Sequence, residues 1–134
     1  MIVLDASAWV CALVDAGDQG DASRAVLEAD PDWLVPAHGP IETLRTVRRY
    51  EQAGVLGRDA AQSFGDAVVA TQLRVVGPEP WLLAEVWELR YTVSPYDAPY
   101  VVLARRFDAA LVTIDSRLAR AASDLDVPTV VPGS

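Results

Sequence analysis

Hydrophobic and polar positions along the chain form blocks that predict strands and helices in alternation. Short runs of consecutive apolar residues, typical of strands buried on both faces, occur at 1–4, 32–36, 73–76, 110–114 and 129–131. Between these runs, apolar residues at helical spacing predict helices at 7–14, 21–29, 40–53, 58–71, 80–90, 95–107 and 116–125. This alternation favours one α/β domain over residues 1–134, with a central, mostly parallel twisted sheet flanked by helices.

Turn and cap residues predict where several of these helices begin and end. Gly17 and Gly20 predict a break between the first two helices, and Gly54 predicts the end of the third. Ser94, followed by proline, predicts the start of the sixth helix and places Asp97 in its first turn.

The helix predicted at 40–53 carries a charged residue near its start and a mixed inward face. Ile41, Leu44 and either Val47 or Arg48 are spaced to form the stripe that faces the core. Glu42 lies in the first turn of the same helix.

Four carboxylates occupy comparable places in the predicted α/β pattern. Asp5 and Asp115 directly follow apolar strands, while Glu42 and Asp97 lie in the first turns of helices. Strand ends and the helix starts that follow them share one edge of a parallel sheet, so all four are expected to converge. Each acid alone is explained by helix capping. Together they require a cation, because two charges about 4 Å apart repel by about 4 kcal/mol at an effective dielectric of about 20. Oxygen ligands of this kind suit Mg²⁺ or Mn²⁺.

Other candidate residues have simpler interpretations. His38 is the only histidine and lies beside Gly39 in a predicted turn, where a solvated side chain is favoured over a general base. The cluster Arg45, Arg48 and Arg49 is typical of a solvated helix face, although it lies on the Glu42 helix, where it could meet phosphates.

Composition narrows the classes of function. The chain has 134 residues, is 51% hydrophobic and has a formal net charge of -8, and its basic residues are all arginine. The lack of lysine disfavours P-loop, HAD-type phosphatase and receiver-domain chemistry, and the acidic balance disfavours non-specific coating of nucleic acid. A single cysteine, Cys11, excludes an internal disulfide and predicts a small core residue. No apolar run reaches membrane-spanning length and no signal peptide is visible, so we expect a cytoplasmic protein without membrane contact.

Four sequence blocks resemble the PIN-domain ribonucleases, and within them the toxins of VapBC-type toxin-antitoxin pairs. They are VLDASA, PIETL, YDAPYVVLARR and LVTIDSRLARAA, which contain Asp5, Glu42, Asp97 and Asp115 in the family's order and spacing. Thr43 departs from the pattern, because many relatives have asparagine there. The ordered set spans essentially the whole chain and is more specific than any single block.

The resemblance implies a Mg²⁺- or Mn²⁺-dependent endoribonuclease that is inhibited by a cognate VapB-like antitoxin and forms a homodimer. The implied metal-binding and catalytic acids are Asp5, Glu42, Asp97 and Asp115, with Ser7, Thr113 and Ser116 as their hydrogen-bonding neighbours. Glu42 or Asp97 would orient the attacking water. Two alternatives remain: a PIN fold that has lost catalysis and serves as an interaction module, and a nuclease that acts on DNA or flap structures.

Overall fold

A computed structural model describes all 134 residues and contains one five-stranded sheet. The strands are β1 (Ile2–Leu4), β2 (Trp33–Pro36), β3 (Arg74–Val76), β4 (Ala110–Val112) and β5 (Thr129–Val130). Their order is β3-β2-β1-β4-β5 and every neighbouring pair is parallel. The expected α/β architecture with a parallel sheet is therefore confirmed, and the first strand of the chain lies at the centre of the sheet.

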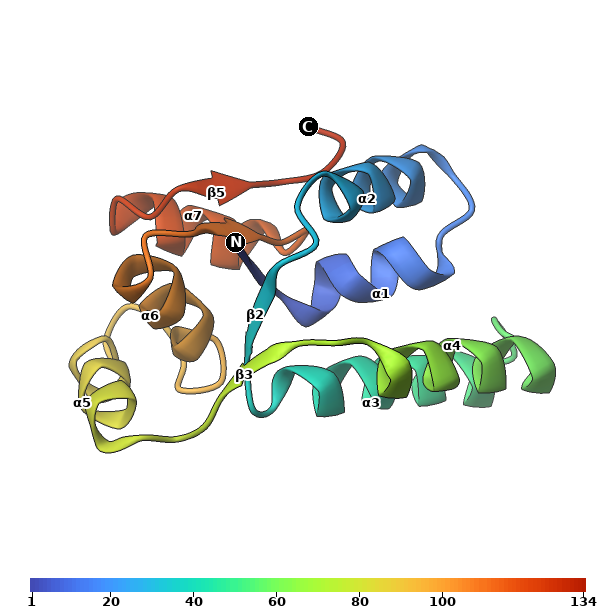
Figure 1. Cartoon of the computed structure of the whole chain (residues 1–134), viewed down its shortest axis with the longest axis horizontal. Coiled ribbons are helices and arrows are strands. Elements are labelled where there is room, and N and C mark those ends of the chain that lie inside the picture. The colour runs from blue at the N-terminus through green and yellow to red at the C-terminus, as the bar shows by residue number, and fades with distance from the viewer.

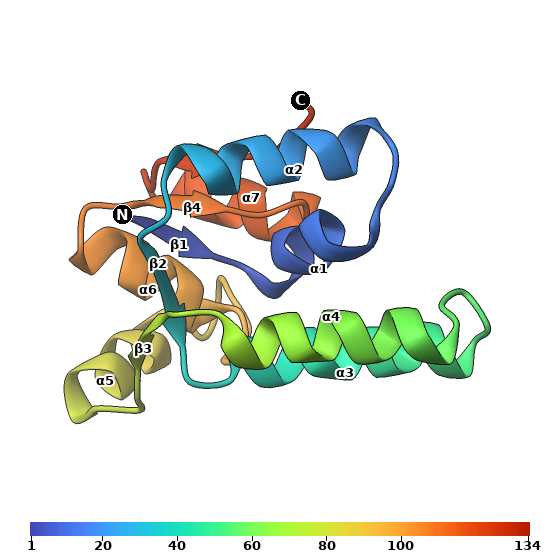
Figure 2. The ribbon, with the colours of Figure 1, turned by 45° about the vertical axis from the view of Figure 1, so that its right-hand side comes forward.

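Seven helices flank this sheet. They are α1 (Ala6–Val14), α2 (Asp18–Ala29), α3 (Gly39–Gln52), α4 (Arg58–Ala70), α5 (Pro80–Glu88), α6 (Ala98–Arg106) and α7 (Ser116–Asp124). Helices α3 and α4 pair side by side and extend well beyond the sheet (Figure 2). None of the seven helices has the length and apolarity that a membrane span requires.

The core has two halves, one on each face of the sheet. Successive residues of a strand point to opposite faces, and accordingly Val3 belongs to the cluster formed with α5, α6 and α7, whereas Ile2 and Leu4 belong to the cluster formed with α1, α2 and α4. Helix α6 is buried from Ala98 to Ala104, which explains its nearly continuous apolar sequence. The sheet thus lies between two helical layers (Figure 1).

The start of α2 differs from the prediction, because Gly20 lies inside the helix rather than in the break before it. The Asp15 carboxylate accepts hydrogen bonds from the backbone N–H of Gly17 at 2.9 Å and of Gly20 at 3.0 Å. A Cβ on Gly20 would lie 1.9 Å from the Asp15 carbonyl oxygen. Gly20 is therefore required by close backbone packing, and the helix begins at Asp18.

The start of α6 also differs. Residues 94–97 form a turn, in which the backbone N–H groups of Asp97 and Ala98 donate to the Ser94 carbonyl at 3.1 and 2.8 Å. The helix begins only at Ala98, so Asp97 immediately precedes it instead of lying in its first turn. The predicted end of α3 is confirmed, since Gly54 has a φ of 75° just beyond it.

The inward face of α3 agrees with the prediction at Leu44 and Val47 and differs from it at Ile41. Ile41 is 65% exposed and Arg48 is exposed, whereas Thr43 and Val47 are buried. Thr43 is tolerated there because its hydroxyl donates to the Gly39 carbonyl at 3.0 Å. Glu42 consequently lies on the edge between the buried face and solvent.

Candidate functional site

The carboxyl edge of the sheet gathers the side chains that the sequence singled out. Asp5 follows β1 and Asp115 lies at the start of α7, three residues beyond β4, so both strands end at this edge. Glu42 and Asp97 lie at the starts of α3 and α6. The N-terminal ends of helices carry a partial positive charge, which favours carboxylates in such positions.

Asp5 is buried and is held by two hydroxyl groups. It is the one charged residue that is buried in the chain, with 6% of the residue exposed. The hydroxyls of Ser7 and Thr113 both donate to Asp5 Oδ2, the latter at 2.7 Å. Asp5 makes no side-chain capping bond to α1. Its carboxylate is therefore not explained as a helix cap.

The same two hydroxyls connect Asp5 to the Asp115 loop. Ser7 Oγ accepts the backbone N–H of Ile114 at 3.1 Å, and Thr113 Oγ1 accepts that of Asp115 at 3.0 Å. Asp115 Oδ1 caps α7 by accepting the backbone N–H of Arg117 at 2.9 Å. Asp115 thus performs the capping role that its sequence position suggests, and its other carboxylate oxygen has no hydrogen-bond partner within the chain.

Glu42 has two aromatic neighbours that the sequence interpretation did not foresee. The fully buried Tyr100 donates its hydroxyl to Glu42 Oε2 at 3.2 Å, and His38 Nε2 lies 3.6 Å from Glu42 Oε1. His38 Nε2–H also donates to the Tyr96 carbonyl at 2.8 Å. The interpretation of His38 as a solvated turn residue is therefore wrong, because its ring is half-buried against two tyrosines.

The pKa values of Asp5 and Glu42 are shifted by burial, by hydrogen bonds and by the charges of neighbouring acids. Burial raises the pKa of Asp5; the hydrogen bonds from Ser7 and Thr113 lower it, and repulsion from Asp97 and Asp115 raises it further. Burial likewise raises the pKa of Glu42, which His38 and Tyr100 lower and which the charges of Asp5 and Asp97 raise.

The phenol of Tyr100 serves this cluster as a fixed donor. Burial and the negative charges of Asp5 and Glu42 raise the pKa of Tyr100, so its hydroxyl stays protonated. Gly39 makes room for it, since a Cβ there would lie 3.3 Å from the Tyr100 oxygen. Gly39 thus has a packing reason.

No basic side chain neutralises the centre of the cluster. None of the salt bridges ends on Asp5, Asp97 or Asp115, and Glu42 has only His38. No three His, Cys, Asp or Glu side chains lie close enough together to form a ready metal-binding group. The donor set nevertheless suits a hard cation, because it consists of carboxylate oxygens and one oxygen of buried Asp5 accepts no hydrogen bond.

Comparison with known proteins identifies the family. The family model described as PIN domain matches residues 2–124. Ribonuclease VapC9 of Mycobacterium tuberculosis is 38% identical over 136 residues, covering 98% of this chain and 99% of the relative. The chain belongs to the VapC group of PIN domains. Ribonuclease VapC3 of the same organism is 38% identical over 124 residues, covering 90% of this chain and 86% of that protein.

Solved structures support the PIN fold. FitAcB from Neisseria gonorrhoeae has a TM-score of 0.73 at 17% identity and covers 98% of both chains. VapC20 of M. tuberculosis, described as a Sarcin-Ricin loop cleaving toxin, has a TM-score of 0.69 at 18% identity, covering 90% of this chain and 95% of that one. At these identities the likeness concerns the fold.

The structure places the four predicted acids at the same edge of the sheet and differs in what it shows of their predicted neighbours. Ser7 and Thr113 contact Asp5, as the resemblance implied, whereas exposed Ser116 makes no side-chain hydrogen bond. Tyr100 was missed because an isolated tyrosine in an apolar helix is typical of a core residue. Its position three residues after Asp97 was the only available signal.

Two hollows lie near the residues that contact the acids. One of about 370 Å³ is apolar and lies between α5 and the 94–97 turn, with His38 and Tyr96 on its wall. The other, of about 430 Å³, begins at Ser7 and Ile114 and reaches Tyr50 near the end of α3. None of the four acids lines either hollow, but each hollow is lined by a neighbour of one acid: His38, beside Glu42, and Ser7, beside Asp5.

Proposed function

We propose that this protein is a Mg²⁺- or Mn²⁺-dependent endoribonuclease that hydrolyses RNA phosphodiester bonds as the toxin of a type II toxin-antitoxin pair. The observation that carries the proposal is the buried carboxylate of Asp5, held by two hydroxyls and surrounded by further acids without a basic partner. Relatives named VapC ribonuclease, alike over nearly the full length, supply the substrate class.

The ion would be held by Asp5, Glu42, Asp97 and Asp115. When bound, it supplies a water of lowered pKa and positive charge for the phosphate oxygens. The protein's part is orientation: Ser7 and Thr113 hold Asp5 in place.

The remaining acids would orient the attacking water and complete the metal site. Tyr100 and His38 position Glu42, leaving Glu42 or the half-buried Asp97 to orient the attacking water. Asp115 joins from the start of α7. Ser116, which makes no side-chain hydrogen bond, remains the weakest candidate of the set.

The proposed partners follow from charge and from the relatives. A VapB-like antitoxin would place basic side chains in the acidic cleft of a protein with net charge -8. A homodimer has a candidate surface in Leu83, Trp87 and Tyr91, which lie along α5 and the turn after it and are 53%, 63% and 87% exposed. RNA cleavage and antitoxin binding would take place in the cytoplasm.

Cleavage assays test the proposal. Labelled single-stranded RNA, single-stranded DNA and a DNA flap substrate are incubated with the protein in Mn²⁺, in Mg²⁺ and in excess chelator. We expect only RNA to be cut, only with metal, and not by Asp97→Asn. Cleavage in chelator would contradict the metal requirement, and cutting of DNA or flaps alone would favour the DNA nuclease. A folded protein that binds the antitoxin but cuts nothing would favour the interaction module.

A further inference from the structure

Helix α3 carries positive charge that starts beside Glu42. In a helix of 3.6 residues per turn, the residues three and seven positions beyond Glu42 lie on nearly the same face. These are Arg45 and Arg49, both exposed, and we call them the basic stripe. At 1.5 Å per residue they lie about 4.5 and 10.5 Å along the axis from Glu42.

The basic stripe has no partner within the chain. The arginines that form ion pairs are Arg24, Arg74, Arg105 and Arg106, and Arg90 stacks on Trp87 and Tyr91. Arg45 and Arg49 donate no side-chain hydrogen bond and form no ion pair, although the chain has 19 acidic residues. Their charge is therefore available to an external anion.

The fold gains little from placing these charges together, because the repulsion between them opposes the favourable position of Arg49 in the last turn of α3. Like charges four residues apart destabilise a helix by about 0.2–0.5 kcal/mol. Both side chains are exposed, so they fill no space in the core. No contact within the folded chain accounts for their position.

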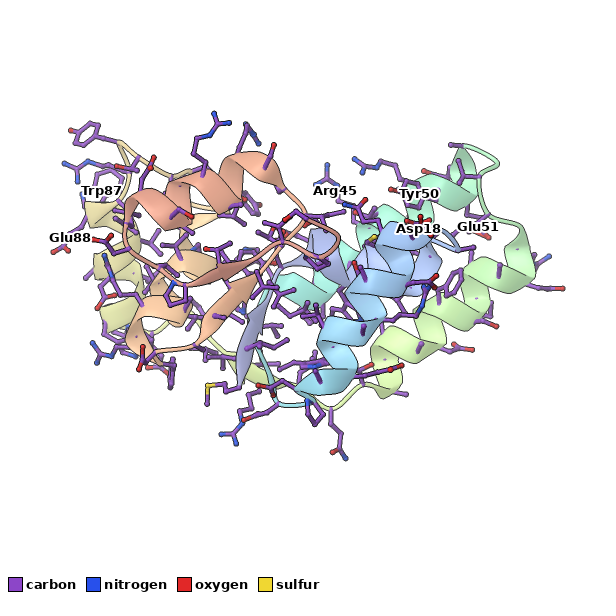
Figure 3. The ribbon with its side chains drawn as sticks, turned by 90° about the horizontal axis from the view of Figure 1, so that it is seen from above. Asp18, Arg45, Tyr50, Glu51, Trp87 and Glu88 are labelled. Carbon is purple, nitrogen blue, oxygen red and sulfur yellow. The ribbon has the colours of Figure 1, made fainter.

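The other faces of α3 are already occupied. Thr43 and Val47 are buried, and Arg48 and Glu51 line a hollow shared with Ala61 of α4. The basic stripe therefore faces solvent on the side that also carries Glu42. Figure 3 shows Arg45, Tyr50 and Glu51 following one another along this part of the molecule, with Trp87 and Glu88 at the far end.

We propose that Arg45 and Arg49 bind phosphates of the RNA strand next to the one that is cleaved, and so guide the strand along α3. This inference rests on the proposed function. The acids repel an RNA strand until a cation is present. Arg45 and Arg49, about one and two helical turns from Glu42, attract the neighbouring phosphates of the strand. Arginine suits this role because its planar fork matches phosphate oxygens.

The test measures RNA binding without cleavage, in an Asp97→Asn background with Mg²⁺. A short fluorescein-labelled single-stranded RNA of mixed sequence is titrated by anisotropy between about 50 and 200 mM KCl. Each phosphate contact contributes about 0.7 to the slope of log K against log salt for single strands. The Arg45→Ala/Arg49→Ala double variant should therefore have a slope smaller by about 1.4. Between about 50 and 200 mM KCl, its loss of affinity should be about sevenfold smaller than that of the parent protein. Arg48→Ala, on the α4-facing side of the same helix, is the matched control.

The outcomes separate this inference from the proposed function. If the Arg45→Ala/Arg49→Ala variant has the same salt slope as the parent protein, the inference is overturned. The proposed function then still stands if the native chain cleaves RNA. A slope lowered by about 0.7 in Arg48→Ala also overturns the inference, because the loss of any one positive charge on α3 then explains the effect. If the double variant binds RNA normally but escapes the antitoxin, the basic stripe belongs to a protein interface. If the native chain cuts no RNA, the proposed function fails first.

Discussion

Replacing Thr113 by valine tests the network that holds Asp5. Valine keeps the shape of threonine and removes only the hydroxyl, which donates to Asp5 Oδ2 at 2.7 Å and accepts the backbone N–H of Asp115 at 3.0 Å. A lost hydrogen bond to a charged group costs about 2 kcal/mol, and leaving a partly buried N–H without an acceptor costs about 2 kcal/mol more. We expect Thr113→Val to lower the free energy of unfolding by about 4 kcal/mol at pH 8.

The cost of Thr113→Val should depend on pH with a defined sign. The Thr113 hydroxyl lowers the pKa of Asp5, which burial has raised, so removing the hydroxyl raises the pKa of Asp5 in the folded state further. A carboxyl whose folded pKa is raised loses stability as pH rises through that pKa. In acid, where Asp5 is protonated, only a neutral hydrogen bond of about 1 kcal/mol is lost, so the total cost falls to about 3 kcal/mol.

Urea unfolding in chelator, from the most acidic pH at which the protein is folded to pH 8, measures this difference. Thr113→Ser is the control, because it keeps the hydroxyl and loses one methyl group. It should cost about 1 kcal/mol at every pH. A Thr113→Val cost that stays constant with pH would refute the link between this hydroxyl and the Asp5 charge.

Three further results are expected. Asp5→Asn should reduce RNA cleavage at least 100-fold. The variant should unfold in urea at pH 8 no earlier than the native chain, because it removes the charge of a carboxyl group whose pKa burial has raised. Unfolding at a lower urea concentration would assign Asp5 a structural role. Mn²⁺ at about 100 times its Kd should raise the free energy of unfolding of the native chain by about 2.7 kcal/mol, and that of Asp5→Asn by far less. Thermal denaturation measures both, and equal stabilisation of the two proteins would mean that the ion binds elsewhere. Gly20→Ala should destabilise the fold by at least about 1–3 kcal/mol, because the new Cβ would lie 1.9 Å from the Asp15 carbonyl oxygen. Gly65→Ala in α4 is the control: a Cβ there has no neighbour within 4 Å, so the change should be neutral or stabilising. Similar unfolding curves for the two variants would disprove the tight contact at Gly20.

The sequence predicted the elements well where one physical signal dominated. Apolar runs marked all five strands, and Gly54 marked the end of α3 by its positive φ. The prediction failed at Gly20 and Asp97, where the helix start is decided by contacts. Gly20 packs against the Asp15 backbone, and the turn at Ser94 delays α6. Such contacts leave no periodic trace in the sequence.

The candidate site was predictable in its acids and not in their surroundings. Position after strands and at helix starts was enough to select Asp5 and Asp115, because topology alone brings such residues to one edge. The hydrogen bond of Tyr100 and the burial of His38 depend on how α6 and the turn before it pack against the start of α3. Strand order was equally hidden, since it follows from the crossovers and not from any local pattern.

The central position of β1 has a consequence for synthesis of the chain. Strand β1 is synthesised first, and one of its two neighbours in the sheet is β4. Asp5 accepts one of its hydrogen bonds from Thr113, which is 108 residues later in the chain. At about 5–20 residues per second, that partner emerges from the ribosome roughly 5 to 20 s after Asp5. A nascent chain therefore lacks one of the two hydroxyl groups that hold Asp5 until most of its 134 residues have been translated.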